Sequence, residues 1–128
     1  KRFNLSKREE QLMFGTIRNR DILIQAKNEL KKEKIDKSYF GELLNEHHSI
    51  LDKILNISTP RIELMLKSAL QVGAYGGKIN GSGGGGCMIA YCPENFSETK
   101  RAIEKAGGKA HIVNIAAGTQ EDKKENIV

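Results

Sequence analysis

Apolar residues recur at helical spacing through the start of the chain and predict one long first helix. Ser6 and Glu9 match the capping box that begins many helices. Gly15 weakens the middle of this helix by about 1 kcal/mol relative to alanine. The helix fades into the charged residues 31–34, where basic side chains suit the end of the helix dipole. The apolar stripe consists of Leu12, Met13, Ile17, Leu23, Ile24 and Leu30.

Two further helices are predicted before residue 73. The second spans residues 37–55, and the third begins at Thr59 and Pro60. Threonine is a good N-cap, and proline fits the first helical position, where its missing N–H costs nothing. Gly73 is the expected stop of the third helix. The apolar positions are Phe40, Leu43, Leu44, Ile50, Leu51, Ile54 and Leu55 in the second helix, and Ile62, Met65, Leu66, Ala69 and Leu70 in the third.

After residue 73 the apolar segments are short, with the length of strands. Residues 74–80 and 87–92 read as strands, and residues 109–115 alternate as a half-buried strand does. A short helix with a cap-like Asn95 lies between the last two. Strands mixed with helices in this order predict an α+β domain, with an antiparallel sheet and helices packed on one face. We assign residues 1–119 to this domain and residues 120–128 to a polar tail.

Composition and charge exclude several classes of function. The 128 residues carry a net charge of +5, but acidic and basic residues are interspersed and aromatics are only 5%. This distribution does not favour nucleic-acid binding. No apolar run reaches the roughly 20 residues of a membrane helix, and we expect no signal peptide. Cys87 and Cys92 are expected to be buried, reduced thiols of a cytoplasmic protein.

The segment of residues 81–86, here called the glycine turn, is the strongest functional signal. It consists of Gly81, Ser82, Gly83, Gly84, Gly85 and Gly86. Glycine permits positive φ and close approach to the backbone, so successive N–H groups can surround an anion. Lys78, just upstream, is a candidate for adding positive charge, and Ser82 for a hydrogen bond to phosphate or to an amide of the turn. A flexible linker has the same composition, but strands are predicted on both sides of the turn.

The glycine turn does not match two common nucleotide motifs. No Gly-Lys-Ser/Thr follows it, as a P-loop requires. A strand and not a helix follows it, unlike a Rossmann turn. Residues 73–87 instead resemble the third signature of the GHMP kinases, a superfamily that includes galactokinase, homoserine kinase, mevalonate kinase and phosphomevalonate kinase. Residues 40–48 and 57–60 are similar to the preceding helices of galactokinase-like sugar kinases.

This resemblance implies a ferredoxin-like sandwich whose glycine turn lies beside the ATP phosphates, with Lys78 and residues 81–86 as the nucleotide-binding residues. ATP and Mg²⁺ are then the cofactors, bound mainly by an N-terminal lobe of the same parent chain. Ser82 stands where sugar kinases commonly carry alanine, and Gly84 or Gly85 where galactokinases often carry an aromatic residue. The acceptor alcohol therefore stays open between galactose, another sugar such as a heptose phosphate, and mevalonate.

The family's other active-site parts are not found in this sequence. We find no Pro-x-x-x-Gly-Leu-x-Ser-Ser phosphate loop, and we assign no catalytic and no metal-binding residue. The lobe is therefore expected to be inactive alone and to expose a face through which a truncated form can dimerise. His47 and His48 point about 100° apart on a helix, which favours cap or surface roles over a shared metal. A free-standing ligand-binding or protein-interaction module of ferredoxin-like fold is the alternative.

Overall fold

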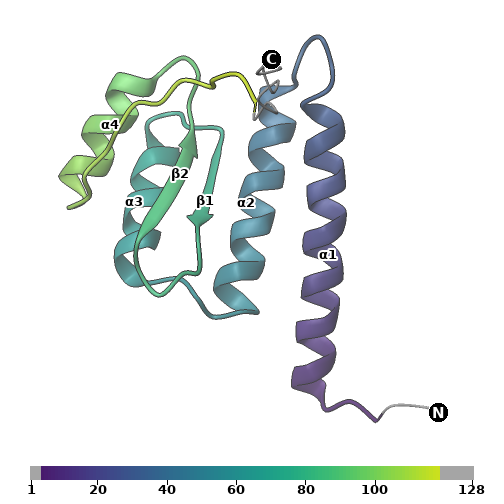
Figure 1. The fold of residues 1–128 in the computed structure, drawn as a ribbon. Coiled ribbons are helices and arrows are strands. Elements are labelled where there is room, and N and C mark those ends of the chain that lie inside the picture. Colours follow the sequence, from purple (N-terminus) through teal and green to yellow (C-terminus); the bar gives the residue numbers. More distant parts are fainter. Residues whose placement is uncertain (1–3, 119–128) are drawn as a thin grey trace, which may run out of the picture.

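Residues 4–118 are described by a computed structural model, in which four helices surround a two-stranded sheet (Figure 1). The elements are α1 (Lys7–Glu29), α2 (Lys37–Lys53), α3 (Pro60–Gln71), β1 (Gly76–Asn80), β2 (Cys87–Tyr91) and α4 (Phe96–Lys105). The predicted α+β class and the antiparallel sheet are confirmed. The predicted polar tail, residues 120–128, lies outside the described residues.

Local sequence determines where most of the helices begin. The Ser6 hydroxyl accepts the Glu9 N–H at 3.3 Å while the Glu9 carboxylate accepts the Ser6 N–H at 2.7 Å, which is the predicted capping box. Thr59 caps α3 by accepting the Ile62 N–H at 3.3 Å. Asn95 precedes α4 but its side chain makes no capping hydrogen bond, so that predicted cap is wrong.

Helix α1 packs on α2 through a face that the sequence pattern did not identify. The buried contact residues are Gly15 and Ile22, and Ile22 joins Leu43 and Ile50 of α2 in one core cluster. Most of the predicted stripe is exposed instead: Met13, Ile17, Leu23, Ile24 and Leu30. Gly15 is needed here because a Cβ would stand 3.0 Å from the Ile54 side chain. The close approach of the two helices therefore determines which face of α1 is buried.

Polar contacts fix the turn between α1 and α2. The Glu29 side chain is buried, with only 2% of its surface exposed, and its carboxylate accepts the Asp36 N–H at 2.8 Å and the Lys32 ammonium at 2.6 Å. The hydrogen bond from Lys32, followed by that from the Asp36 amide, lowers the pKa of Glu29. A bidentate pair between Arg18 and Glu46 further joins the two helices, with N–O distances of 2.6 and 2.7 Å.

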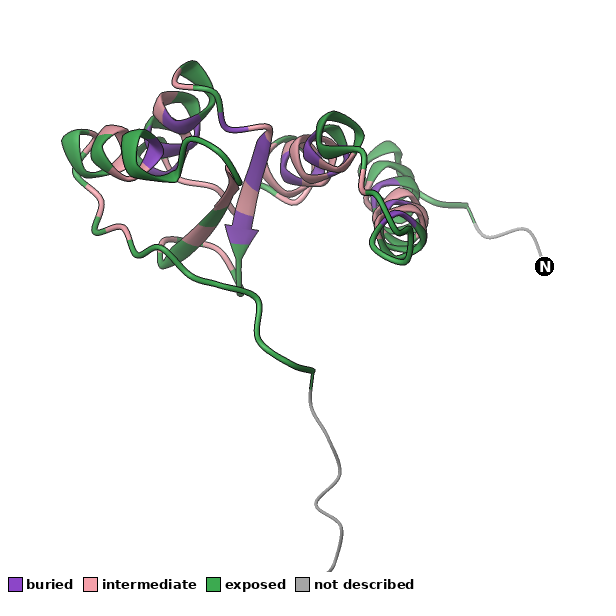
Figure 2. Cartoon of the chain, turned by 90° about the horizontal axis from the view of Figure 1, so that it is seen from above, coloured by how far each residue is buried: buried purple, intermediate pink, exposed green. Residues whose placement is uncertain are grey.

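The sheet is a hairpin in which β1 is the buried strand and β2 the more exposed one (Figure 2). Lys78 of β1 stands opposite Ile89 of β2 in the antiparallel register. Ile79 is fully buried against α3, in a cluster with Ile62, Met65 and Leu66. Partly buried residues of α2, the α2–α3 connection, β2, α4 and the end of α4 complete this cluster: Leu51, Ile57, Met88, Ile103 and Ala106.

The predicted third strand is not formed. Residues 109–118 have no regular structure and run past α4 as an extended coil (Figure 1). Val113 is 82% and Ile115 99% exposed. Within the described part, β2 pairs only with β1. An alternating sequence becomes a strand only where a neighbouring strand pairs with its backbone, and no strand within residues 4–118 pairs with this segment.

No helix among the described residues is both long enough and apolar enough to cross a bilayer.

Replacing Gly41 by alanine is expected to destabilise the fold strongly. A Cβ at Gly41 would lie 2.4 Å from the Tyr75 carbonyl oxygen, and a Cβ at Gly76 would lie 2.1 Å from the Gly41 carbonyl oxygen. We expect Gly41→Ala to lower the free energy of unfolding by about 2 kcal/mol or more, measured by chemical denaturation. Gly118→Ala, where a Cβ meets nothing within 4 Å, is the matched control. Equal stabilities of the two variants would contradict the close contact.

The buried Glu29 is expected to make stability depend on pH. Because its pKa is lowered by folding, its contribution is present above the unfolded value of about 4.3 and is lost as pH falls through the folded pKa. Glu29→Gln should therefore be less stable than the parent at pH 7, and the difference should shrink at pH 3. Denaturation curves at both pH values test this, and a difference that does not change with pH would contradict it.

Candidate functional site

Helix α2 covers the outer edge of β1 with two polar side chains. Asn45 accepts the Gly77 N–H at 3.0 Å and donates to the Tyr75 carbonyl at 3.2 Å. One turn later, the buried His48 accepts the Ile79 N–H at its Nδ1, at 3.4 Å. An uncovered edge would leave these amides to water or to another chain. The two side chains replace a neighbouring strand and hold β1 in position just before the glycine turn.

His48 also connects β1 to α3. Its Nε2 lies 2.7 Å from a carboxylate oxygen of Glu63, which also accepts the Ser58 hydroxyl. Because Nδ1 accepts a backbone N–H, the geometry assigns the ring proton to Nε2 and makes it the donor to Glu63. Burial raises the pKa of Glu63, but the hydrogen bonds from Ser58 and His48 outweigh it and lower the pKa overall. Ser58 and His48 both contact the carboxylate, so they form a structural link and not a nucleophile–base pair.

The glycine turn is attached on one side and open on the other. Gly84 donates its N–H to the Ile57 carbonyl at 2.7 Å, and a Cβ at Gly83 would come within 2.6 Å of Ile57. A Cβ at Gly81, Gly85 or Gly86 would meet nothing within 4 Å. Positive φ is found at the turn positions Gly81, Gly83, Gly84, Gly85 and Gly86. The turn therefore needs glycine for its backbone conformation and for contact with Ile57, and it leaves backbone exposed on its free side.

Lys78 lies on β1 with its side chain half-buried. Its ammonium group donates to the Ile79 carbonyl, and burial lowers its pKa. Residues 78 and 79 alternate across the sheet, so Lys78 faces away from the core that contains Ile79. Ser82 is exposed in the turn. The structure thus brings the predicted site residues together on one hairpin, whereas their role in nucleotide binding stays a prediction.

Sequence reasoning missed the residues that support this hairpin. Asn45 and His48 are three apart on α2, and this spacing was the available signal for a shared polar contact. Ile57 carried no signal, since only its backbone carbonyl binds the turn. Cys87 was expected in the core but is exposed, because it begins the less covered strand, and Cys92 is half-buried; both thiols are free.

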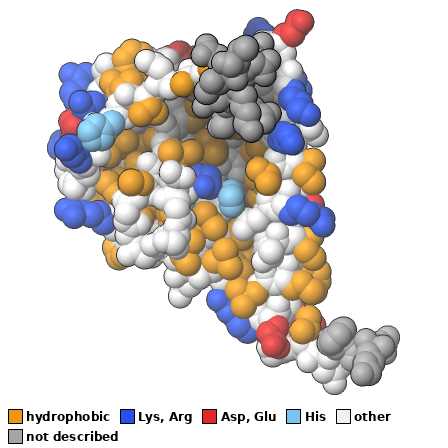
Figure 3. Space-filling view, in the orientation of Figure 1, with side chains coloured by type: hydrophobic (Ala, Val, Ile, Leu, Met, Phe, Trp, Pro, Cys, Tyr) orange, Lys and Arg blue, Asp and Glu red, His pale blue; other side chains and the backbone are white. Residues whose placement is uncertain are grey.

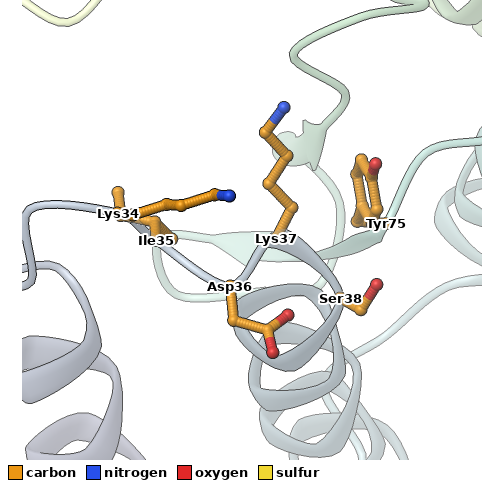
Figure 4. Close-up of a pocket in the computed structure, with 6 residues that line it drawn as sticks. All are labelled: Lys34, Ile35, Asp36, Lys37, Ser38 and Tyr75. Atoms are coloured by element: carbon orange, nitrogen blue, oxygen red, sulfur yellow. The ribbon is translucent and has the colours of Figure 1, made fainter.

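A hollow of about 410 Å³ lies at the other end of α2 (Figure 4). It is lined by Lys34, Ile35, Asp36, Lys37, Ser38 and Tyr75. Two of its charged groups already have partners: Lys37 pairs with Glu94, and Asp36 caps α2 through the Tyr39 N–H. We therefore do not take it as the site. Across residues 4–118 there is no cluster of three or more His, Cys, Asp or Glu side chains suited to a metal ion.

Comparison with known proteins identifies the class to which this fold and turn belong. The antiparallel hairpin carries the open glycine turn, and α2 and α3 pack against its first strand. A family model described as GHMP kinases C terminal matches residues 26–110. The chain therefore belongs to the GHMP kinase C-terminal family, whose members are parts of ATP-dependent phosphotransferases.

Individual relatives agree with this assignment. A mevalonate kinase of Thermococcus gammatolerans is 44% identical over 85 residues, which cover 66% of this chain and 25% of that protein. A galactokinase of Saccharomyces cerevisiae is 35% identical over 68 residues, which cover 50% of this chain and 13% of that protein. A crystal structure of L. major mevalonate kinase in complex with R-mevalonate matches with a TM-score of 0.57 and 26% identity, covering 81% of this chain and 34% of that one. The chain spans about a quarter of the length of the mevalonate kinase.

Asn45→Ala is expected to destabilise the domain, because it leaves the Gly77 N–H and the Tyr75 carbonyl without partners. Unpaired buried backbone groups cost about 1–3 kcal/mol. Asn28→Ala is the matched control, since Asn28 is an exposed residue of α1 with the same change in helix propensity. Thermal unfolding compares the two variants, and hydrogen exchange at Gly77 shows whether the edge of β1 has opened. Unchanged exchange at Gly77 would contradict the role given to Asn45.

Proposed function

We propose that this chain is the C-terminal lobe of an ATP-dependent small-molecule kinase, and that the glycine turn forms one wall of its nucleotide phosphate site. The observation that carries the proposal is the geometry of the turn. Its attachment to Ile57 fixes the backbone, while the open positions at Gly81, Gly85 and Gly86 admit another molecule close to the main chain. Backbone N–H groups exposed in this way bind phosphate oxygens.

Phosphoryl transfer depends on positioning and on charge neutralisation, and this lobe supplies part of the positioning. Lys78 and the backbone of the glycine turn are the groups proposed to contact the phosphates. ATP supplies the transferred phosphoryl group when bound. The described residues offer no carboxylate cluster for Mg²⁺, so we place no metal ligand on this lobe. The proposed partner is the N-terminal lobe of the parent chain, and we expect no turnover from this lobe alone.

We propose mevalonate as the acceptor of the whole enzyme. The similarity to mevalonate kinases covers more of the chain, at higher identity, than the similarity to the yeast galactokinase. This choice differs from the sugar acceptor that the resemblance of residues 40–48 and 57–60 to galactokinase-like kinases suggested. A sugar remains the second candidate, because the matched galactokinase is itself 35% identical.

A chimeric enzyme tests the proposal. Residues 26–110 of this chain would replace the matched part of the T. gammatolerans mevalonate kinase. We expect the chimera to phosphorylate mevalonate with ATP, and the 128-residue chain alone to show no activity. Gly85→Val in the chimera, at a position with open space but positive φ, should reduce kcat/KM at least about tenfold, equivalent to about 1.4 kcal/mol.

Lys105→Ala, on the exposed last turn of α4, serves as the control variant and should leave activity unchanged. A folded chimera that fails to phosphorylate any alcohol would contradict the kinase proposal and favour a free-standing module. A chimera that accepts galactose and not mevalonate would transfer the proposal to sugar phosphorylation. Kinase activity of the isolated 128-residue chain would contradict the proposal that it needs an N-terminal lobe.

A further inference from the structure

Two basic side chains, His47 of α2 and Lys78 of β1, come from elements that pack against each other, and the charge of Lys78 acts on His47. Lys78 projects from the face of β1 opposite Ile79, and the residue across the strand pair, Ile89, is 44% exposed on that same face. His47 precedes His48, whose ring reaches the Ile79 N–H at the adjacent edge of β1. Figure 3 shows a basic side chain beside a histidine in a hollow near the centre of this face, with hydrophobic side chains around them.

Both groups are half-buried without a carboxylate. Within residues 4–118, no ion pair joins either of them to an acidic side chain. The Lys78 ammonium donates only to a backbone carbonyl, that of Ile79. Burial, then the charge of Lys78, then that of His48 lower the pKa of His47, and burial lowers the pKa of Lys78. Partly desolvated cations without a counter-charge are unfavourable, and an anion would relieve both.

The acidic groups in this region are already engaged. On α2 itself, Glu46 forms the bidentate pair with Arg18 of α1. On α3, Glu63 is bound by His48 and Ser58. The groups whose charges act on His47 are both basic, Lys78 of β1 and His48 of α2. The two basic groups therefore lie in a region whose carboxylates, Glu46 and Glu63, are bound to other residues.

We propose that His47 and Lys78 together bind an oxyanion, a phosphate or carboxylate group of a small-molecule ligand, on the hairpin face that leads to the glycine turn. Lys78 and Asn80 share this face of β1, and the turn begins at Gly81. The inference rests on the proposed function, because ATP carries phosphate groups and an acidic acceptor of a kinase carries a carboxylate. It adds His47 to the site and makes binding depend on protonation.

The proposal predicts that the affinity for the anion depends on pH. An anion favours the charged form of His47, so binding raises the pKa of this ring above its value in the free chain. The affinity for the anion therefore increases as pH falls through the pKa of the free chain, and decreases above the pKa of the complex. A purely structural histidine would not couple its titration to a ligand.

The test is an NMR titration of the three histidine rings in the 128-residue chain. The probes are inorganic tripolyphosphate and mevalonate, with neutral galactose as the control ligand. We expect the pKa of His47 to rise by about half a unit or more with at least one of the two anions, and not with galactose. His111, an exposed histidine outside the hairpin, reports nonspecific ion binding and should not shift.

Variants separate the roles of the two residues. Lys78→Met should weaken anion binding about tenfold or more, while Lys105→Met, an equivalent change on exposed α4, should not. His47→Gln should keep a hydrogen-bonding side chain but remove the pH dependence of binding, and His111→Gln should leave that dependence intact. Circular dichroism confirms that each variant is folded.

The two anions distinguish the source of the ligand group. A shift with tripolyphosphate alone assigns the site to nucleotide phosphates, and a shift with mevalonate alone assigns it to the carboxylate of the acceptor. If ATP perturbs the amides of the glycine turn while His47 titrates unchanged with both anions, the inference is overturned and the proposed function stands. If neither ATP nor either anion perturbs the hairpin, the inference is overturned, and the activity of the chimera decides the proposed function, because that function assigns most of the nucleotide site to the N-terminal lobe.

Discussion

The covering of the outer edge of β1 by α2 is the contact on which the remaining structure depends. A two-stranded hairpin alone is only marginally stable in water, and its outer edge exposes N–H and C=O groups. Here Asn45 and His48 bind those groups, and the glycines at positions 41 and 76 let the helix backbone approach closely enough for them to reach. Without this contact β1 would not be held beside α2, and the glycine turn that follows it would have no fixed position.

The same contact connects the candidate site to the core. Hydrogen bonds connect His48 to Glu63 of α3, and Glu63 to Ser58 before this helix. The α2–α3 connection in turn binds the glycine turn through the Ile57 carbonyl. Ile79, whose N–H reaches His48, is itself fully buried among the α3 side chains. The turn is thus held at its first strand and at its middle by one continuous set of contacts. A glycine-rich segment that would be flexible alone gains a defined conformation without adding side chains that would block a ligand.

Features determined by neighbouring residues were predictable from the sequence, whereas those determined by distant partners were not. The capping box at Ser6, the Thr59 cap and the hairpin around the glycine turn depend on short-range chemistry, and all three are present. The buried face of α1 depends on how closely α2 approaches, so Ile22 was missed although the periodicity was read correctly. Residues 109–115 have the alternation of a strand, but alternation cannot supply the neighbour that a strand must pair with. The roles of Asn45 and His48 likewise became visible only when α2 lay beside β1.

The apolar surface of this chain supports its assignment as one lobe of a longer enzyme. Met13, Ile17 and Ile24 lie on α1 with 39–51% of their surfaces exposed, on the side away from Gly15 and Ile22. Val113 and Ile115 are almost wholly exposed on the other side of the sheet. Exposed apolar side chains in such numbers often contact other protein, and the matched mevalonate kinase is about four times as long as the part that aligns with this chain. In the proposed two-lobed enzyme, the open side of the glycine turn and the basic groups of the hairpin have the same explanation, since a site shared between two lobes is half-complete on each.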